Sequence, residues 1–249
     1  MPDATVGVLC SMDGSRRGAM TRAMRVQTIG DTGSRMILFY GAGSGAGKST
    51  LSRMIHEALE RRGVEARYFA ENDVLRSEAF APYVEAVENG AADNVDVLLS
   101  SCREFIDEVD RSGQLYVVDS VLPCVDWLVS ARCPMPQVRR FHAQVNRLLT
   151  PLNPIQVFLT GDTRTFLDRA VDDRGMEWAK ALCLERCQSD DVIPSLLAYF
   201  DTMREAASDL LDDWPYGKIV VDTAADDLST CANDILRQLG LAVDSPPCG

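Results

Sequence analysis

Short apolar runs alternate with amphipathic stretches along most of the chain. The runs are largely apolar without polar alternation, which is typical of parallel strands that are covered on both faces. The stretches between them repeat their hydrophobic residues every three to four positions, which is the period of a helix with one buried face. The predicted strands are 36–40, 66–70, 115–118, 155–159 and 218–221.

Helices are predicted between these strands, and the first should end near Gly63, where a glycine can close a helix. The predicted helical regions are 51–59, 74–111, 124–132, 137–149, 163–173, 176–188, 194–212 and 228–239. Alternation of strands and helices indicates an α/β fold, with a parallel sheet between two layers of helices. Residues 1–34 lack this periodicity, so we expect a poorly ordered N-terminal extension followed by one domain over 35–249.

Composition and charge narrow the class of protein. A chain of 249 residues is long enough for one sizeable α/β domain. Its net charge of −12 argues against nucleic-acid binding, which needs a positively charged surface. No apolar run approaches the roughly 18 residues that cross a bilayer, and no apolar segment follows Arg16 and Arg17 to make an export signal. Eight cysteines without a Cys-x-x-Cys pair are typical of reduced thiols, so the expected compartment is the cytoplasm.

The strongest motif lies between the first predicted strand and the first predicted helix. Residues 42–50 read AGSGAGKST, which matches the phosphate-binding loop pattern of a small residue, four spacers and Gly-Lys-Ser/Thr. Glycines let backbone N–H groups turn toward a phosphate, and the helix that follows directs its positive end to the same anion. Lys48 would bind the β- and γ-phosphates, and Ser49 would bind Mg²⁺. The residues expected to hold the nucleotide are Gly43, Ser44, Gly45, Ala46, Gly47, Lys48, Ser49 and Thr50.

A second acidic group is expected at the end of a neighbouring strand, where it would hold Mg²⁺ through water. Asp119 directly follows the apolar run 115–118 and is the candidate for this group. The competing interpretation of Asp119 is an ordinary helix cap. Ser120 follows it in place of the glutamate that many ATP-driven machines use to activate water. The sequence also has no Asn-Lys-x-Asp motif for guanine. These features favour phosphoryl transfer over a motor or a GTPase switch.

Two further segments suit a nucleotide-binding protein. Arg169 and Arg174 lie on the helix after the fourth strand and could neutralise the transferred phosphoryl group as parts of a lid. Their competing interpretation is solvated arginines paired with nearby aspartates. Asp222 and Thr223 end the last strand, where a backbone-lined adenine pocket is expected.

These motifs together resemble the small-molecule kinases of the P-loop superfamily, over about residues 35–240. That group includes nucleoside and nucleotide kinases, shikimate-type kinases and chloramphenicol phosphotransferase. The stretch RGMEWAKALCLERC is more loosely similar to the ATP-binding tunicamycin-resistance proteins. The resemblance implies a P-loop NTPase fold with strand order 2-3-1-4-5, ATP and Mg²⁺ as cofactors, and a helical lid over about 169–190.

The same resemblance implies an acceptor site over the carboxyl ends of the strands, with a carboxylate after the second strand that accepts a hydroxyl proton. Both Glu71 and Asp73 stand there, and Asp73 is preferred, with the cap of the next helix as its competing role. The chain lacks the Asp-Arg-Ser and Asp-Arg-Tyr/Phe signatures of deoxynucleoside and thymidylate kinases.

The predicted function is an ATP- and Mg²⁺-dependent phosphotransferase that acts on a hydroxyl of a small molecule. The acceptor would be nucleoside-like, or an antibiotic or other specialised metabolite. The alternative is a nucleotide-dependent binding, switch or resistance protein without efficient transfer. The sequence leaves the acceptor and the oligomeric state open, and a homodimer is compatible with it.

Overall fold

A parallel sheet of five strands forms the centre of the molecule. The computed structural model describes residues 33–41 and 43–241, so the predicted extension 1–34 falls almost entirely outside the described residues. The strands are β1 (Met36–Tyr40), β2 (Ala66–Phe69), β3 (Leu115–Asp119), β4 (Ile155–Thr160) and β5 (Gly217–Asp222). Their order is β2-β3-β1-β4-β5 and every neighbouring pair is parallel, which confirms the predicted sheet and its strand order.

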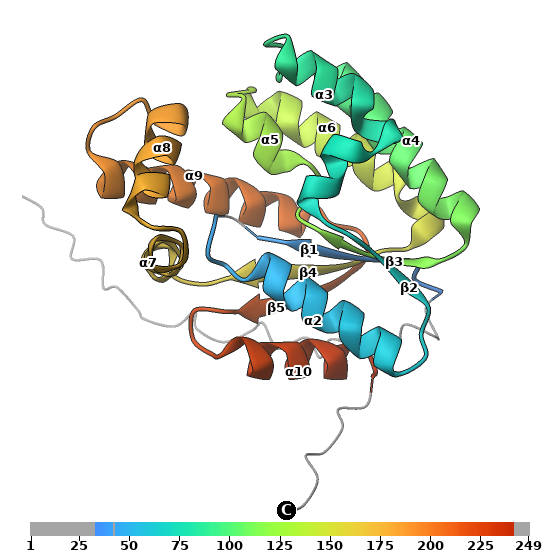
Figure 1. Cartoon of the computed structure of the whole chain (residues 1–249). Helices are drawn as coiled ribbons and strands as arrows, with labels where there is room; N and C mark the ends of the chain where they lie inside the picture. The colour runs from blue at the N-terminus through green and yellow to red at the C-terminus, as the bar shows by residue number, and fades with distance from the viewer. Residues whose placement is uncertain (1–32, 42, 242–249) are drawn as a thin grey trace, which may run out of the picture.

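Helices cover both faces of this sheet (Figure 1). One face carries α2 (Lys48–Arg61) and α10 (Leu228–Gln238). The other carries α4 (Val95–Ser112), α6 (Met135–Leu148) and the inner part of α9 (Val192–Asp212), together with the shorter α3 (Ala81–Glu88) and α5 (Val125–Ser130). The 3₁₀ turns are η1 (Glu71–Arg76), η2 (Glu78–Phe80) and η3 (Thr150–Leu152).

The central strands owe their position to side chains that are apolar on both sides. All five residues of β1 are buried, as are all five of β3. Met36 and Leu38 of β1 pack toward α4 and α6, whereas Ile37 and Phe39 pack toward α2 and α10. This arrangement explains why the central strands appear in the sequence as continuous apolar runs.

The predicted helical region 74–111 is wrong as a continuous element. It is divided into η1, η2, α3 and α4. Pro82 lies in the first turn of α3, where its missing N–H costs nothing. Gly90 follows α3 with a φ of +79°, and Asn94 then caps α4 by accepting a hydrogen bond from the Val97 N–H at 3.2 Å. Residues 89–94 therefore separate α3 from α4.

Two further helices, α7 (Thr163–Arg174) and α8 (Met176–Arg186), lie beyond the end of the sheet at which β4 leads into α7 (Figure 1). They form a small core of their own with the first half of α9. Its buried members are Leu167, Ala179, Cys183, Leu196 and Phe200. The second half of α9 packs into the main core through Met203, Ala207 and Leu210. One helix therefore connects the predicted lid segment to the body of the protein.

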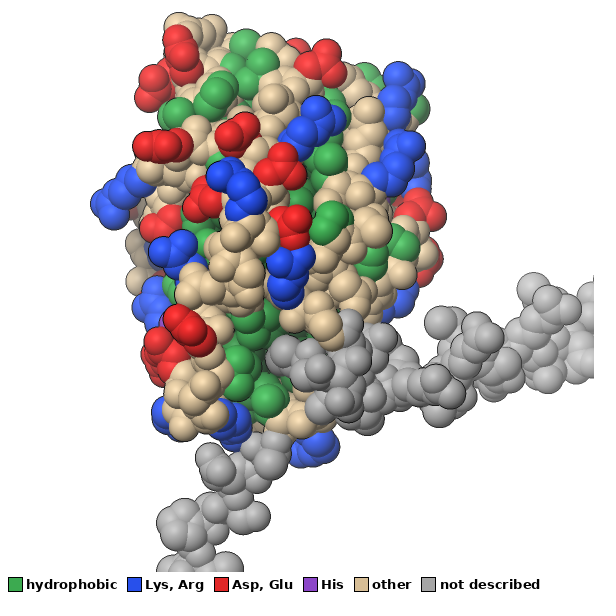
Figure 2. Space-filling view, turned by 90° about the vertical axis from the view of Figure 1, so that its right-hand side faces the viewer, with side chains coloured by type: hydrophobic (Ala, Val, Ile, Leu, Met, Phe, Trp, Pro, Cys, Tyr) green, Lys and Arg blue, Asp and Glu red, His purple; other side chains and the backbone are tan. Residues whose placement is uncertain are grey.

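The charged side chains on the face seen in Figure 2 are interspersed, with acidic and basic groups next to one another. Within the described part of the chain, no helix combines the length and the apolar character that a membrane span needs. The six described cysteines, at 102, 124, 133, 183, 187 and 231, are free thiols.

Candidate phosphate-binding site

The loop between β1 and α2 has a backbone that only glycine adopts readily. Gly43, Gly45 and Gly47 have φ angles of +87°, +86° and +87°. A Cβ at Gly45 would lie 2.0 Å from the carbonyl oxygen of Phe166 on α7, so this position has no room for a side chain. The Lys48 ammonium donates to the Gly43 carbonyl at 2.8 Å and thus lies across the loop. The geometry is that of a phosphate cradle that opens at the N-terminus of α2.

The turn after β5 supports this loop from behind. Thr223 is fully buried, and its hydroxyl donates to the carbonyl of Ala46 at 2.9 Å. The Asp222 carboxylate accepts hydrogen bonds from the Ala224 and Ala225 N–H groups at 2.9 and 3.2 Å. Both predicted nucleotide-binding side chains are therefore engaged with protein backbone. The backbone of the turn is engaged as well, because the Thr223 carbonyl accepts a hydrogen bond from Arg169 and the Thr223 N–H donates to the Thr160 carbonyl.

Asp119 lies beside the end of β1, because its backbone is in register with Phe39. Its side chain is 2% exposed and accepts a hydrogen bond from the Ser120 hydroxyl at 2.7 Å. The Tyr68 hydroxyl approaches its other oxygen at 3.4 Å, and Ser52 of α2 is 3.1 Å from that hydroxyl. The Asp119 carboxylate is thus fixed where the loop begins.

Hydroxyl and carboxylate oxygens are the donors that Mg²⁺ prefers, and Ser49 is exposed at the first turn of α2. The described residues contain no cluster of three or more acidic, histidine or cysteine side chains that would hold a metal alone. The donor set suits a Mg²⁺ that arrives with nucleotide phosphates and keeps several waters. Ser49 and Asp119 fit such an ion.

A pocket of about 190 Å³ opens beside the loop, and we call it the phosphate pocket. It is bounded by the loop and Lys48, by η1, by the start of α5, and by α8 and α9. Its polar and charged lining residues are Ser44, Lys48, Glu71, Ser120, Asp126, Ser130, Arg186 and Tyr199. Two carboxylates and two cations therefore meet at one end of the sheet, where loops place ligand-binding groups in folds of this class.

The two carboxylates in this pocket are held in environments that disfavour their charge. Burial raises the pKa of Glu71, and Lys48 opposes that shift. Burial also raises the pKa of Asp126, against the opposing effects of Lys48 and of the hydrogen bond that Asp126 accepts from the Tyr40 hydroxyl at 2.8 Å. Raised carboxyl pKa values are typical of groups that exchange protons near neutral pH.

The Asp73 side chain forms a cap in this structure, which was the competing role given to it. Its carboxylate accepts a hydrogen bond from the Ala70 N–H at 2.8 Å and closes the first turn of η1. It does not line the phosphate pocket, whereas Glu71 does. The geometry therefore moves the preference to Glu71, because the side chain of Asp73 is occupied as a cap.

The two predicted lid arginines do not line the phosphate pocket in this conformation, although the charge of Arg174 is close enough to lower the pKa of Glu71. Arg169 donates to the carbonyl of Thr223 at 2.6 Å, on the β5 side of the loop. The Arg174 guanidinium lies 5.1 Å from the ring centroid of Trp178 and 3.8 Å from the Asp173 carboxylate. The cation that α8 brings to the phosphate pocket is Arg186.

Asp126 and Arg186 were not singled out from the sequence, although Arg186 lies within the stretch RGMEWAKALCLERC. Asp126 reaches the pocket through the bend between β3 and α5, and Arg186 through the packing of α8 on α9. Positive φ angles at Ser120 and Cys124, of 63° and 60°, are the local sign of that bend. Such angles are uncommon outside glycine and often occur at functional sites.

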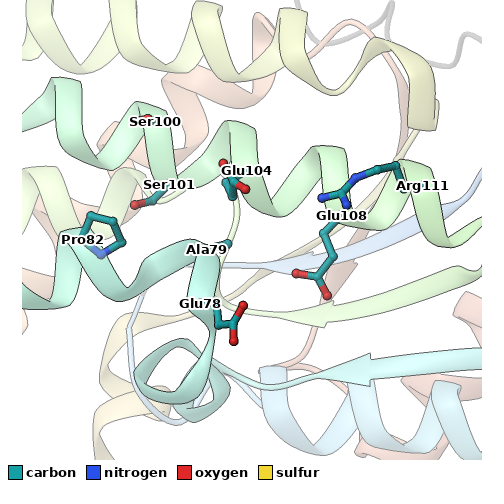
Figure 3. Close-up of a pocket in the computed structure, with 8 residues that line it drawn as sticks. All are labelled: Glu78, Ala79, Pro82, Ser100, Ser101, Glu104, Glu108 and Arg111. Carbon is teal, nitrogen blue, oxygen red and sulfur yellow. The ribbon is translucent and has the colours of Figure 1, made fainter.

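A larger pocket of about 310 Å³ lies away from the loop, on the outer side of α4 and η2 (Figure 3). Its charged lining consists of Glu78, Glu104 and Glu108, with Arg111 at one end. An excess of carboxylates repels phosphate, so the nucleotide site is not there.

The strand order, the glycine loop and the lysine at the start of α2 together decide the fold. It is a P-loop NTPase fold. No known family model matches the chain, and no curated protein matches it in sequence.

Two solved structures are similar to this chain over most of its length. The YorR protein of Bacillus subtilis, in complex with phosphorylated GDP, has a TM-score of 0.48 and 14% identity, covering 82% of this chain and 95% of its own. APE1195 has a TM-score of 0.48 and 11% identity, covering 83% of this chain and 95% of its own. Similarities this distant say nothing about the substrate.

Proposed function

We propose that the protein is an ATP- and Mg²⁺-dependent kinase that transfers the γ-phosphoryl group to a hydroxyl of a small molecule. The observation that carries this proposal is the phosphate pocket itself, where Lys48 of the loop faces two carboxylates with raised pKa values, Glu71 and Asp126. A phosphate-binding loop alone would suit any nucleotide-binding protein. A proton acceptor beside it is what transfer to an alcohol requires.

The loop residues would bind the nucleotide first. Backbone N–H groups of 43–47 surround the β-phosphate, and Lys48 exchanges the Gly43 carbonyl for the β- and γ-phosphate oxygens. The Ser49 hydroxyl and, through water, Asp119 would hold Mg²⁺, which neutralises charge on the two terminal phosphates.

Glu71 would then receive the proton of the acceptor hydroxyl. As the acceptor oxygen forms a bond to the γ-phosphorus, the bond from that phosphorus to the bridging oxygen breaks, and ADP leaves with the electron pair. Asp126 lies in the same pocket and is the second candidate for the base. Its hydrogen bond from Tyr40 ties it to β1, which suits a group that orients the hydroxyl.

Arg186 would stabilise the charge that spreads over the γ-phosphoryl oxygens during transfer. Arg169 and Arg174 would join it only if α7 and α8 moved, because their guanidinium groups now contact Thr223 and Trp178. A closing movement of this kind would also exclude water from the reaction.

A second function has one observation in its favour. With Arg169 and Arg174 engaged outside the pocket, the described conformation does not present the complete set of predicted lid cations to a nucleotide. That arrangement suits a switch, in which nucleotide binding moves α7 and α8 without efficient phosphoryl transfer.

Incubation with ATP and a panel of hydroxylated compounds separates the two functions. A kinase releases ADP in a one-to-one ratio with an acceptor that gains a phosphoryl group, and Lys48→Ala abolishes both. Tight nucleotide binding with no modified acceptor across the panel would favour the switch. Protection of α7 and α8 from proteolysis by ADP or ATP would then report the movement.

A further inference from the structure

A second pocket, of about 430 Å³, adjoins the phosphate pocket, and we call it the outer pocket. The two share Trp127, Ser130 and Arg186 in their linings, so the outer pocket lies directly beside the phosphate pocket. The outer pocket lies between η1, α3 and α5 on one side and the end of α8 on the other (Figure 1). Its volume is that of a site for a small organic molecule.

Apolar side chains dominate this lining, and two of them are unusually exposed. Leu75 of η1 is 71% exposed and Val87 of α3 is 43% exposed, although both are large hydrophobic residues. Both line the outer pocket, together with Val74 and Val84. Exposed apolar surface that gathers around a concave site is typical of a surface that a ligand covers.

Two aromatic side chains, Tyr83 and Trp127, form one wall of the outer pocket. The rings of Tyr83 and Trp127 are stacked, with centroids 5.6 Å apart and an interplanar angle of 6°. The Tyr83 hydroxyl donates to the Ala92 carbonyl at 3.1 Å, so its polar end is already satisfied by backbone. Phe80 packs edge-on against Trp127 and supports the wall from the core. Such a wall offers an acceptor apolar contact and few new hydrogen bonds.

The charges in the outer pocket do not suit a phosphorylated acceptor. Among the described residues that line it, Arg186 is the single cation, and it stands at the junction with the phosphate pocket. Glu88 is the single carboxylate in that lining, and no ion pair to it occurs within the described part of the chain. Binding a phosphate monoester generally takes several cationic or N–H donors. The described lining also contains no Asn or Gln with which to recognise a nucleobase edge.

The geometry points to an acceptor that is a hydroxylated compound with an apolar body and without a phosphate group. This inference rests on the proposed kinase function. The body of the acceptor lies against the wall of Trp127 and Tyr83, and its hydroxyl extends past Arg186 toward Glu71. Glu88 accommodates an uncharged or a cationic substituent at the outer end and disfavours an anionic one.

The outer pocket can be tested by binding alone, before any acceptor is known. The probe is N-phenyl-1-naphthylamine, a neutral aromatic compound whose fluorescence rises in apolar sites. Val87→Asp places a charge on the lining and should weaken probe binding by about tenfold or more, because an ionised carboxylate opposes apolar contact. Leu184→Asp is the matched control, since Leu184 is 67% exposed and lies outside both pockets, and it should change the affinity less than about twofold.

Both variants should bind a fluorescent ATP analogue as the parent protein does, which shows that they fold. Equal probe affinity for Val87→Asp and the parent would overturn the inference.

Transfer assays then distinguish this inference from the proposed function. With ATP, 2-(2-naphthyl)ethanol should be phosphorylated in preference to nucleosides and to nucleoside monophosphates, and Val87→Asp should remove that preference. Faster transfer to a nucleoside monophosphate would overturn the inference and uphold the kinase. Probe binding that depends on Val87, without transfer to any acceptor, would contradict the kinase and leave the apolar pocket standing.

Discussion

The hydroxyl of Thr223 donates a hydrogen bond to the carbonyl of Ala46 at 2.9 Å, across 177 positions of the sequence. Both residues are buried, so water does not compete for this bond. It joins the turn after β5 to the middle of the phosphate-binding loop. The shape of the loop therefore depends on the far edge of the sheet as well as on its own glycines.

Thr223→Val removes this hydroxyl without changing the side-chain shape. It should lower the free energy of unfolding by about 1–3 kcal/mol, because the Ala46 carbonyl is left buried without its donor. The affinity for ATP should fall as well, by about tenfold for each 1.4 kcal/mol that the displaced loop loses in binding. Chemical denaturation and titration with a fluorescent ATP analogue measure the two effects. Thr223→Ser keeps the donor and should retain ATP affinity, so an equal loss in both variants would contradict this role.

A comparison of Gly45 with Gly63 distinguishes two reasons for a glycine: a positive φ angle and a lack of space for a side chain. Both have positive φ angles, but a Cβ at Gly63 would meet nothing within 4 Å, whereas one at Gly45 would meet the Phe166 carbonyl at 2.0 Å. Gly63→Ala should cost about 1–2 kcal/mol of unfolding free energy and leave ATP binding intact. Gly45→Ala should cost more and should abolish tight ATP binding, because α7 or the loop must shift. Comparable behaviour of the two variants in denaturation and nucleotide titration would show that the contact with α7 is unimportant.

Glu71 and Asp73 are two positions apart, but we expect Glu71 to act as the base and Asp73 to cap a turn. Glu71→Gln should lower kcat by about 100-fold or more with little change in ATP affinity, as expected for loss of a general base. Asp73→Asn should have a much smaller effect on kcat, because it weakens only a turn. Single-turnover kinetics with saturating ATP make the comparison. A larger effect at Asp73 would reverse the assignment.

The pH profile gives an independent test of the same group. A base acts only when it is ionised, and burial raises the pKa of Glu71, so kcat should be lost as pH falls through a value above the ordinary carboxyl range. If Glu71→Gln loses kcat at low pH as the parent protein does, the loss belongs to another group. Asp126 is then the first candidate, because its pKa is raised too.

His142 makes the stability of the fold depend on pH. It is 3% exposed, and burial lowers its pKa to about 4, with Asp213 opposing the shift and Arg139 adding to it. The unfolded chain takes up a proton near the ordinary value of about 6.5, whereas the folded protein resists it. The stabilising contribution is therefore complete above that value and is lost as pH falls toward 4, up to roughly 3 kcal/mol.

Denaturation at several pH values checks this expectation. The slope of unfolding free energy against pH between 4 and 6.5 should be shallower in His142→Gln than in the parent protein. The comparison concerns slopes, so an overall loss of stability in the variant does not affect it. Identical slopes would show that His142 titrates alike in the folded and unfolded states.

The sheet and the glycine loop could be predicted from the sequence because their signals are local. A buried parallel strand such as β1 must be apolar on both faces, and a phosphate cradle needs glycines and a lysine at fixed spacing. The sequence did not predict the break between α3 and α4, although Gly90 marks it, because helical periodicity continues on both sides.

The rest of the pocket depends on how elements pack. The sequence favoured Asp73 over Glu71, with a cap as the competing role of Asp73, and the turn geometry of η1 shows that its carboxylate forms that cap. Arg186 reaches the pocket because α8 packs on α9, and neighbouring residues give no sign of that contact. Arg169 and Arg174 are on the predicted helix, but their partners, Thr223 and Trp178, were not foreseeable from spacing.

The central claim is that the loop holds ATP so that its terminal phosphoryl group passes to an alcohol. ATP labelled in the γ-phosphoryl group, incubated with the protein, Mg²⁺ and hydroxylated aromatic acceptors, tests it most directly. The label should move to an organic acceptor, ADP should form in equal amount, and Lys48→Ala should abolish both. Label that remains in ATP, or appears only as inorganic phosphate while the nucleotide is demonstrably bound, would contradict it.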